Sequence, residues 1–522
     1  QKPEPTEGSS AKLNQKSEIR NQKQRMTDQQ TSYRQIMKAT SIFGGVQVIK
    51  IIILIIRSKV VAVLLGPIGI GVMGLLNTTI GIIGGLTNSG LGTSSVKNVA
   101  EANVTNDSRK IALIVTVLRR WVWVTGLIGL FITLIFSSWL SKITFGNSNY
   151  TLGFIWISLS LLFNQISTGQ LVLLQGMRKH KYLAQANMYG ALLGLLVSLP
   201  IYYYWRLDGI VPAIIFTSLV TMLCSWYFAG KVTIEKVDVS YQTTWLEGKE
   251  MLRMGLVVGL SGLIAIGASY IVRIYIGRSG GLADVGLYTA GFAIINTYVG
   301  LVFTAMGTDF YPRLSGVAHD NKEATIMINQ QAEIAVLVLA PILAMFLIFI
   351  NWVVVLLYSS QFTPVNGMIQ WAALGMYFRA ASWCIAFVLL AKGASKLFFW
   401  NELIANVYLL VLNILGYKYF GLTGLGFSFL LGYFFYAIQV YMVAKLKYAF
   451  AFDNSFYKVF GIQMALGVAA FVVIKTTISP VYYVVGTLLI ILSTLYSLRE
   501  LNKRIGLKSV LYAAMNKFVK NN

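Results

Sequence analysis

Apolar runs of about 20 residues recur along the chain between Ser41 and Leu498, separated by short polar segments. A run of that length crosses the roughly 30 Å hydrocarbon core of a membrane as one α-helix. The pattern predicts fourteen such helices, at residues 40–65, 68–92, 114–140, 151–176, 183–205, 209–230, 251–276, 284–308, 328–357, 365–391, 397–417, 422–446, 457–476 and 480–498. Because the connections are short, neighbouring helices are expected to be antiparallel. The predicted fold class is an all-α polytopic membrane protein.

Two stretches of the chain resemble each other, which indicates an internal repeat. The first, RSKVVAVLLGPIGIGVMGLL, starts at Arg57, and the second, RIYIGRSGGLADVGLY, starts at Arg273. Arg57 precedes Gly71 by 14 positions, and Arg273 precedes Gly286 by 13. Repeated halves with a site between them are the usual plan of membrane transporters, so we expect two pseudo-symmetric six-helix lobes and two further C-terminal helices.

Polar segments divide the chain into further parts. Residues 1–38 are polar and basic and lack the apolar core of a signal peptide, so a disordered cytoplasmic tail is expected there. Met26 is a candidate natural start, and residues 1–25 are left out of the fold prediction. The other predicted parts are an N-terminal lobe (39–230), a cytoplasmic linker (231–250), a C-terminal lobe (251–448), two additional transmembrane helices (449–498) and a basic cytoplasmic tail (499–522).

Composition supports a membrane protein and excludes a soluble one. Only 12% of the residues are charged, against about 25% in soluble domains, and 56% are hydrophobic. With the N-terminus in the cytoplasm, the cytoplasmic segments carry 33 Lys and Arg residues and the outer segments carry 5. This asymmetry predicts that both termini are cytoplasmic, and it accounts for the net charge of +24 without a nucleic-acid partner.

Five basic residues remain within the predicted helices, where a charge is costly: Lys50, Arg57, Lys59, Arg273 and Arg379. Lys50 and Arg57 share one helix face because they are seven positions apart, whereas Lys59 faces the opposite way. Our hypothesis is that Lys50, Arg57, Arg273 and Arg379 hold an anionic ligand, since the predicted membrane interior has at most one clear acid to neutralise them. Snorkelling to the outer interface is the alternative for Lys59 and Arg273, and a structural role is the alternative for Lys50 and Arg57.

Neutral polar residues follow the faces of several predicted helices. They are Asn77, Thr78, Asn164, Thr168, Gln175, Asn296, Thr304, Asn406 and Asn413. Such groups would line a wet cavity and bind sugar hydroxyls, although hydrogen bonding between helices explains any single one equally well. Acids are few: Asp309 and Glu333 lie at helix ends, and Glu402 shares a face with Asn406. Glu402 either lines the cavity or pairs with Lys396 and the start of its helix.

The sequence holds no recognisable catalytic or cofactor site. Cys224 and Cys384 lie in apolar runs, and His180 and His319 lie in separate loops, so neither a disulfide framework nor a zinc site is predicted. The phosphate-binding motif GxxxxGK[ST] is absent, and the outer loops are too short for an enzyme domain. We therefore expect no enzyme activity, no cofactor and no metal.

Several motifs resemble a known family. Five segments are similar to segments of bacterial oligosaccharide-lipid flippases. In chain order they are VAVLLGPIGIGVMG, SGLGTSSVKNVAE, DVGLYTAGFAI, GTDFYPRLS and VLLAKGASKLFFWNE. The resemblance covers about residues 34–446 and is nearest to O-antigen translocases and lipid III flippases of the multidrug/oligosaccharidyl-lipid/polysaccharide (MOP) superfamily. It implies MATE-like lobes around a central cavity that works by alternating access. It also implies cavity cations at Lys50, Lys59, Arg273 and Arg379, whereas Arg57 departs from the pattern.

The resemblance further implies a cargo and a place. The cargo would be an undecaprenyl-pyrophosphate-linked oligosaccharide, such as an O-antigen repeat unit, moved from the cytoplasmic to the outer leaflet of the bacterial inner membrane. Membrane lipids, a polysaccharide polymerase and a chain-length regulator are the other expected partners. The helices 457–476 and 480–498 resemble the added pair of lipid II flippases, which forms a groove for the lipid tail.

Two other functions are compatible with such a chain. A MATE-type antiporter on the same fold would export organic cations and needs carboxylates in its cavity, which the basic interior disfavours. A membrane scaffold in a glycan-assembly complex would have no reason to bear the cost of deep charges.

Overall fold

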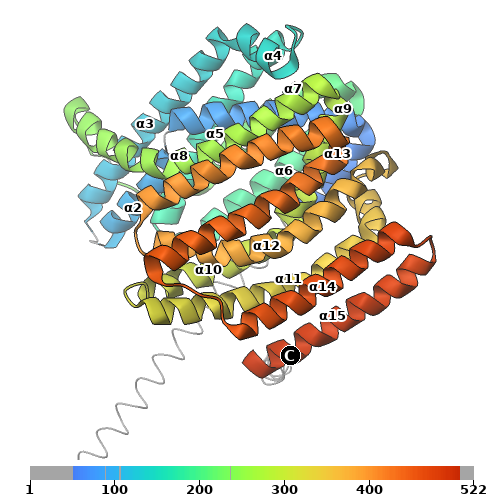
Figure 1. Cartoon of the computed structure of the whole chain (residues 1–522). Helices are drawn as coiled ribbons and strands as arrows, with labels where there is room; N and C mark the ends of the chain where they lie inside the picture. The colour runs from blue at the N-terminus through green and yellow to red at the C-terminus, as the bar shows by residue number, and fades with distance from the viewer. Residues whose placement is uncertain (1–50, 89, 105–106, 236, 506–522) are drawn as a thin grey trace, which may run out of the picture.

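The computed structural model describes residues 51–88, 90–104, 107–235 and 237–505, and all the regular structure of these residues is helical (Figure 1). The N-terminal half contains a helical segment Ile51–Asn88 followed by α2 (Leu91–Val104), α3 (Ser108–Ile135), α4 (Ser137–Phe145), α5 (Thr151–Gly176), α6 (His180–Trp205), the 3₁₀ helix η1 (Arg206–Gly209) and α7 (Ile210–Gly230). The predicted tail 1–38 and the candidate cation Lys50 lie outside the described residues.

The C-terminal half contains the remaining helices. They are α8 (Tyr241–Ser279), α9 (Leu282–Ala293), the π-helix η2 (Ile294–Val299), α10 (Leu301–Gly316), α11 (Asn321–Leu357), the 3₁₀ helix η3 (Ser360–Val365), α12 (Asn366–Ala391), α13 (Ser395–Tyr448), α14 (Asn454–Thr476) and α15 (Val481–Ile505). The predicted all-α membrane fold is confirmed.

The number of membrane spans agrees with the sequence pattern. Ten helical segments of the described chain are long and apolar enough to cross a membrane. Three of them, Ile51–Asn88, His180–Gly230 and Ser395–Tyr448, contain an interruption and each supplies two spans, so the ten segments supply thirteen. With α8 as a further span, the count is consistent with the predicted fourteen.

Glycine makes two of these interruptions possible. The backbone angle φ is +63° at Gly66 and +57° at Gly421, a region that side chains disfavour. After Gly421 the chain folds back along itself, so that Ser428 donates a hydrogen bond to the carbonyl of Leu412 at 2.6 Å. Both glycines lie in the gaps that the apolar pattern leaves between predicted helices.

Three helix boundaries differ from the prediction. α2 occupies a stretch predicted to be a loop; although it is rich in polar residues, Val99 and Ala102 are buried, and α2 packs against α5 and α8. α8 begins ten residues early because Ser240 caps it, accepting a hydrogen bond from the backbone N–H of Thr243 at 3.0 Å. The predicted helix 114–140 is divided into α3 and α4.

α8 joins the two halves of the molecule. It packs against α2 and α3 of the N-terminal half and against α9 and α13 of the C-terminal half. Close to its end, Arg278 donates hydrogen bonds to the carbonyls of Lys142 (3.2 Å) and Ile143 (2.8 Å) beside α4.

α14 and α15 pack against α11 at one edge of the bundle (Figure 1). Between them lies a buried polar contact: the Gln463 amide donates to the hydroxyl of Ser497 at 2.8 Å, and the hydroxyl of Ser493 donates to Gln463 Oε1 at 2.7 Å. At one end, Arg504 of α15 forms an ion pair with Glu333 of α11 at 2.5 Å. The additional helix pair is therefore fixed to the C-terminal half.

Candidate functional site

The two sequence repeats meet through glycines at the predicted outer end of the bundle. Gly71 of the segment Ile51–Asn88 and Gly286 of α9 lie in close backbone contact. A Cβ atom on Gly71 would lie 2.0 Å from the carbonyl oxygen of Leu282, and one on Gly286 would lie 1.8 Å from that of Pro67. Only glycine permits such an approach, so the two repeats are in direct backbone contact at these residues.

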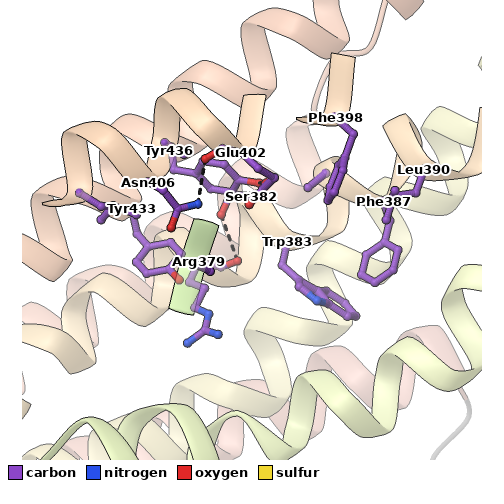
Figure 2. Close-up of a pocket in the computed structure, with 14 residues that line it drawn as sticks. Arg379, Ser382, Trp383, Phe387, Leu390, Phe398, Glu402, Asn406, Tyr433 and Tyr436 are labelled. Atoms are coloured by element: carbon purple, nitrogen blue, oxygen red, sulfur yellow. Dashed lines mark hydrogen bonds between the residues drawn. The ribbon is translucent and has the colours of Figure 1, made fainter. Parts of the chain in front are cut away.

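A cavity of about 330 Å³ lies between α12 and α13, with Ala265 contributed by α8 (Figure 2). Three of the predicted site residues line it: Arg379 from α12, and Glu402 and Asn406 from α13. The remaining wall is aromatic and aliphatic, with Ser382 as a further polar group. The cavity therefore combines one cation, one acid and an amide with rings that suit flat, partly apolar ligands.

Arg379 is held by neutral groups. Its guanidinium donates a hydrogen bond to Oδ1 of Asn296 at 2.5 Å, and it lies 5.5 Å from the ring centroid of Phe303 and 5.3 Å from that of Tyr433. Cation–π contacts of this kind orient a guanidinium without neutralising it. No carboxylate of the described chain forms an ion pair with Arg379. The positive charge therefore remains available to an anion.

Asn296 reaches Arg379 from the π-helix η2. A π-helical turn inside an α-helical span widens the backbone and frequently marks a functional site. Here it presents the Asn296 amide to α12. The structure thus brings together four predicted site residues from three parts of the chain: Asn296, Arg379, Glu402 and Asn406.

Glu402 has a partner that the sequence did not suggest. Its carboxylate accepts a hydrogen bond from the hydroxyl of Tyr436, on the other arm of α13, as the dashed line in Figure 2 shows. The expected pairing with Lys396 is not among its contacts. In Figure 2 the guanidinium of Arg379 points away from this carboxylate. The acid is thus held by a neutral donor and leaves the arginine charge unpaired.

The two described cations of the first helix, Arg57 and Lys59, do not line this cavity. Arg57 lies beside the hydroxyl of Tyr202 in α6. Lys59 donates a hydrogen bond to the carbonyl of Val355 at 2.7 Å, close to the end of α11. A lysine that reaches a helix end in this way has the geometry that the snorkelling alternative describes.

Arg273 is enclosed at the contact between α8 and α9. Its guanidinium donates to the hydroxyl and the carbonyl of Ser269, one turn earlier, and lies 5.4 Å from the ring centroid of Tyr288. Its Nε atom is buried without a hydrogen-bond partner in the described chain. Arg273 does not line the cavity of Arg379, although it too lacks an acidic partner among the described residues.

The other predicted polar residues are not gathered in this cavity. Asn77, Asn164 and Gln175 are exposed on the N-terminal half. Five of the predicted polar side chains donate a hydrogen bond to the backbone carbonyl four residues earlier. They are Thr78, Thr168, Thr304, Asn406 and Asn413. Each of these bonds is local to one helix, so none of them joins two helices as the alternative explanation required.

Sequence reasoning missed the aromatic part of the cavity. Tyr433, Tyr436 and Trp383 belong to apolar runs that resemble ordinary membrane-facing sequence. Only the reversal of the chain at Gly421 brings Tyr436 back to Glu402, and no spacing within one helix signals that contact. The described residues contain no group of three or more His, Cys, Asp or Glu side chains placed to hold a metal ion.

Comparison with known proteins gives a family and a fold. Residues 60–367 match the model of a family described as polysaccharide biosynthesis protein. A search among curated proteins finds no match to the sequence. Among solved structures, an inward-facing multidrug resistance MATE family transporter of the MOP superfamily is similar with a TM-score of 0.64 and 16% identity, over 78% of this chain and 95% of that one.

Two further structures share the fold. The lipid II flippase MurJ, in an inward closed conformation, has a TM-score of 0.62 and 12% identity over 90% of this chain and 99% of its own. A MOP superfamily transporter from Pyrococcus furiosus, whose binding pocket is described as having reverse polarity, has a TM-score of 0.56 and 17% identity over 79% of this chain and 94% of its own.

Proposed function

This chain belongs to the polysaccharide biosynthesis protein family, and we propose that it is a flippase that carries a lipid-linked oligosaccharide across the membrane. The proposed cargo is an undecaprenyl-pyrophosphate-linked glycan, such as an O-antigen repeat unit. It would move from the cytoplasmic to the outer leaflet of the bacterial inner membrane, with both termini of the protein in the cytoplasm. The alternating-access fold shared with MurJ and with MATE transporters supports this assignment.

The observation that carries the proposal is the environment of Arg379. A buried or half-buried cation normally has an acidic partner, because an uncompensated charge in a membrane is costly. Arg379 instead has an amide, two rings and no acid among the described residues. A pyrophosphate would supply the missing negative charge and would accept bidentate hydrogen bonds from the guanidinium.

The rest of the cavity suits the sugar part of such a cargo. The Oδ1 atom of Asn406 and the carboxylate of Glu402 are acceptors for sugar hydroxyls, while Tyr433 and Trp383 offer flat faces to a sugar ring. At about 330 Å³ the cavity holds part of an oligosaccharide rather than all of it. The remaining sugars and the prenyl chain would lie in the space between the lobes and in the surrounding lipid.

Direction and energy follow from the charge of the cargo. The Gly71–Gly286 contact would close the outer end of the bundle, so a ligand would enter from the cytoplasmic side. Outward movement of a negative charge is favoured by a membrane potential that is negative inside, by about 2.3 kcal/mol per charge at 100 mV. The potential would therefore drive transport of an anionic cargo without ATP.

The test is replacement of the arginine in reconstituted vesicles. R379Q leaves a shorter, neutral polar side chain and removes the charge, so flipping of a labelled undecaprenyl-pyrophosphate-linked glycan should fall at least tenfold. R379K should restore only part of the rate, because lysine lacks the bidentate fork. K418Q removes an exposed charge outside the cavity and serves as the matched control. Normal flipping by R379Q, at equal protein in the vesicles, would refute the proposal.

A MATE-type antiporter is the second candidate, and one observation favours it. The cavity contains a carboxylate, Glu402, as cation exporters require, and the fold is shared with multidrug transporters. A cation exporter would confer drug resistance when expressed and would leave surface glycan unchanged in a deletion strain. The opposite pair of results is expected here.

A further inference from the structure

A second polar cavity lies on the N-terminal half, far along the chain from the one just described. It has a volume of about 170 Å³ and is lined by Arg119, Trp123, Gln170 and Trp226 together with small and aliphatic residues. α3 contributes the arginine, α5 the glutamine and α7 the second tryptophan. We infer that this cavity binds the phosphate headgroup of an anionic phospholipid.

Arg119 and Gln170 supply the donors of such a site. Neither side chain has a hydrogen-bond or ion-pair partner in the described part of the chain, and no acidic residue lines the cavity. Gln170 is only 9% exposed, and an unpartnered amide at that depth is costly unless a ligand or water satisfies it. The neighbouring Arg120 differs, since it donates to the carbonyl of Val239 (2.8 Å) and the hydroxyl of Thr244 (2.7 Å).

Two exposed tryptophan rings flank the cavity, and on this ground we place it on the lipid-facing side of the helices. Trp123 and Trp226, on either side of the cavity, are 44% and 50% exposed. Tryptophan prefers the interface between headgroups and hydrocarbon, so these rings place the cavity at headgroup depth.

Local charge and depth favour a phospholipid of the leaflet that faces the basic loops. Gln170 lies six residues before the end of α5 and Trp226 four before the end of α7, where Lys231 follows over the ring of Tyr227 at 4.5 Å. These ends belong to the loops that carry most of the Lys and Arg residues. Basic pockets between transmembrane helices at such positions bind anionic headgroups. A volume of about 170 Å³ accommodates a phosphate but not a glycan.

The experiment measures lipid binding to the full-length chain in detergent by native mass spectrometry. The wild-type protein should bind phosphatidylglycerol in preference to phosphatidylcholine. R119Q should weaken binding of phosphatidylglycerol about tenfold, since charge-assisted hydrogen bonds to phosphate are lost. R109Q is the matched control because Arg109 is an exposed residue of the same helix outside the cavity, and it should leave binding unchanged.

Two further arms keep the inference open to refutation. If R119Q does not fold, Q170L removes the second donor and should weaken binding severalfold. Equal losses in R109Q and R119Q would mean that the attraction is diffuse, and undiminished binding in both R119Q and Q170L would mean that the cavity is not the site. Undecaprenyl pyrophosphate is titrated as the competing source of phosphate. If it displaces phosphatidylglycerol from the wild type but not from R119Q, the cavity belongs to the cargo and the inference fails.

Discussion

The glycine contact between the repeats gives the sharpest structural prediction. Replacement of Gly286 by alanine would place a methyl group 1.8 Å from the carbonyl oxygen of Pro67, which is a backbone atom and has no rotamer to change. The two segments would have to separate by about 1.2 Å or more to reach even a tight contact of 3.0 Å. Overpacking of this kind costs about 1–3 kcal/mol. If the outer end opens by separation of these two segments, the cost falls on the closed conformation alone.

A cost of about 1–3 kcal/mol that falls on the closed outer end shifts the conformational equilibrium about five- to 150-fold toward an open outer end. The expected result for G286A is greater labelling, by a membrane-impermeant thiol reagent, of a cysteine introduced near Leu282, together with a loss of flipping. G267A is the control. Gly267 lies in the same half of the molecule, and a Cβ atom there would have no neighbouring atom within 4 Å. Unchanged labelling in G286A, with a folded protein, would show that the glycine contact does not govern closure.

Two other predictions concern the C-terminal half. E402Q preserves the acceptor that holds the Tyr436 hydroxyl, so flipping of the glycan is expected to stay within about twofold of wild type, whereas an antiporter that needs the charge would lose transport. Q463A leaves the hydroxyls of Ser493 and Ser497 without their buried partner, so the thermal unfolding midpoint should fall by an amount that corresponds to about 1–3 kcal/mol, while Q242A, at an exposed position, should leave it unchanged. An unchanged midpoint in Q463A would show that the α14–α15 contact adds nothing to stability.

The chain belongs to the polysaccharide biosynthesis protein family, and the expected all-α membrane fold is confirmed. The motifs that carried the resemblance lie at places where the fold leaves little freedom. The contact of Gly71 with Gly286 falls on the two stretches that the internal repeat had paired. Sequence and structure agree here because a backbone-to-backbone approach requires glycine, and a requirement of that kind is visible in a single sequence.

The sequence predicted which site residues share a face of one helix, but not which residues of other helices they contact. Five cations within predicted membrane helices stand out in the sequence, since the cost of a charge depends on depth and depth can be counted along a helix. Their gathering into one phosphate site stays a hypothesis: Arg379 lines the cavity, while Arg57, Lys59 and Arg273 contact other groups. Helical periodicity shows which residues share a face, but it does not say which face meets which neighbour.

The sequence by itself determined the spans, the turns at Gly66 and Gly421 and the uneven distribution of basic residues. It did so because a chain in lipid must satisfy its backbone within each helix, which leaves long apolar runs as a direct record of the fold. Only the tertiary structure decided that Arg379 meets Asn296 on a π-helix and that Glu402 meets Tyr436 across a reversal of the chain. Those contacts depend on which helices pack against each other. Because membrane helices have similar apolar surfaces, their packing partners are selected by small differences in shape that no local sequence pattern encodes.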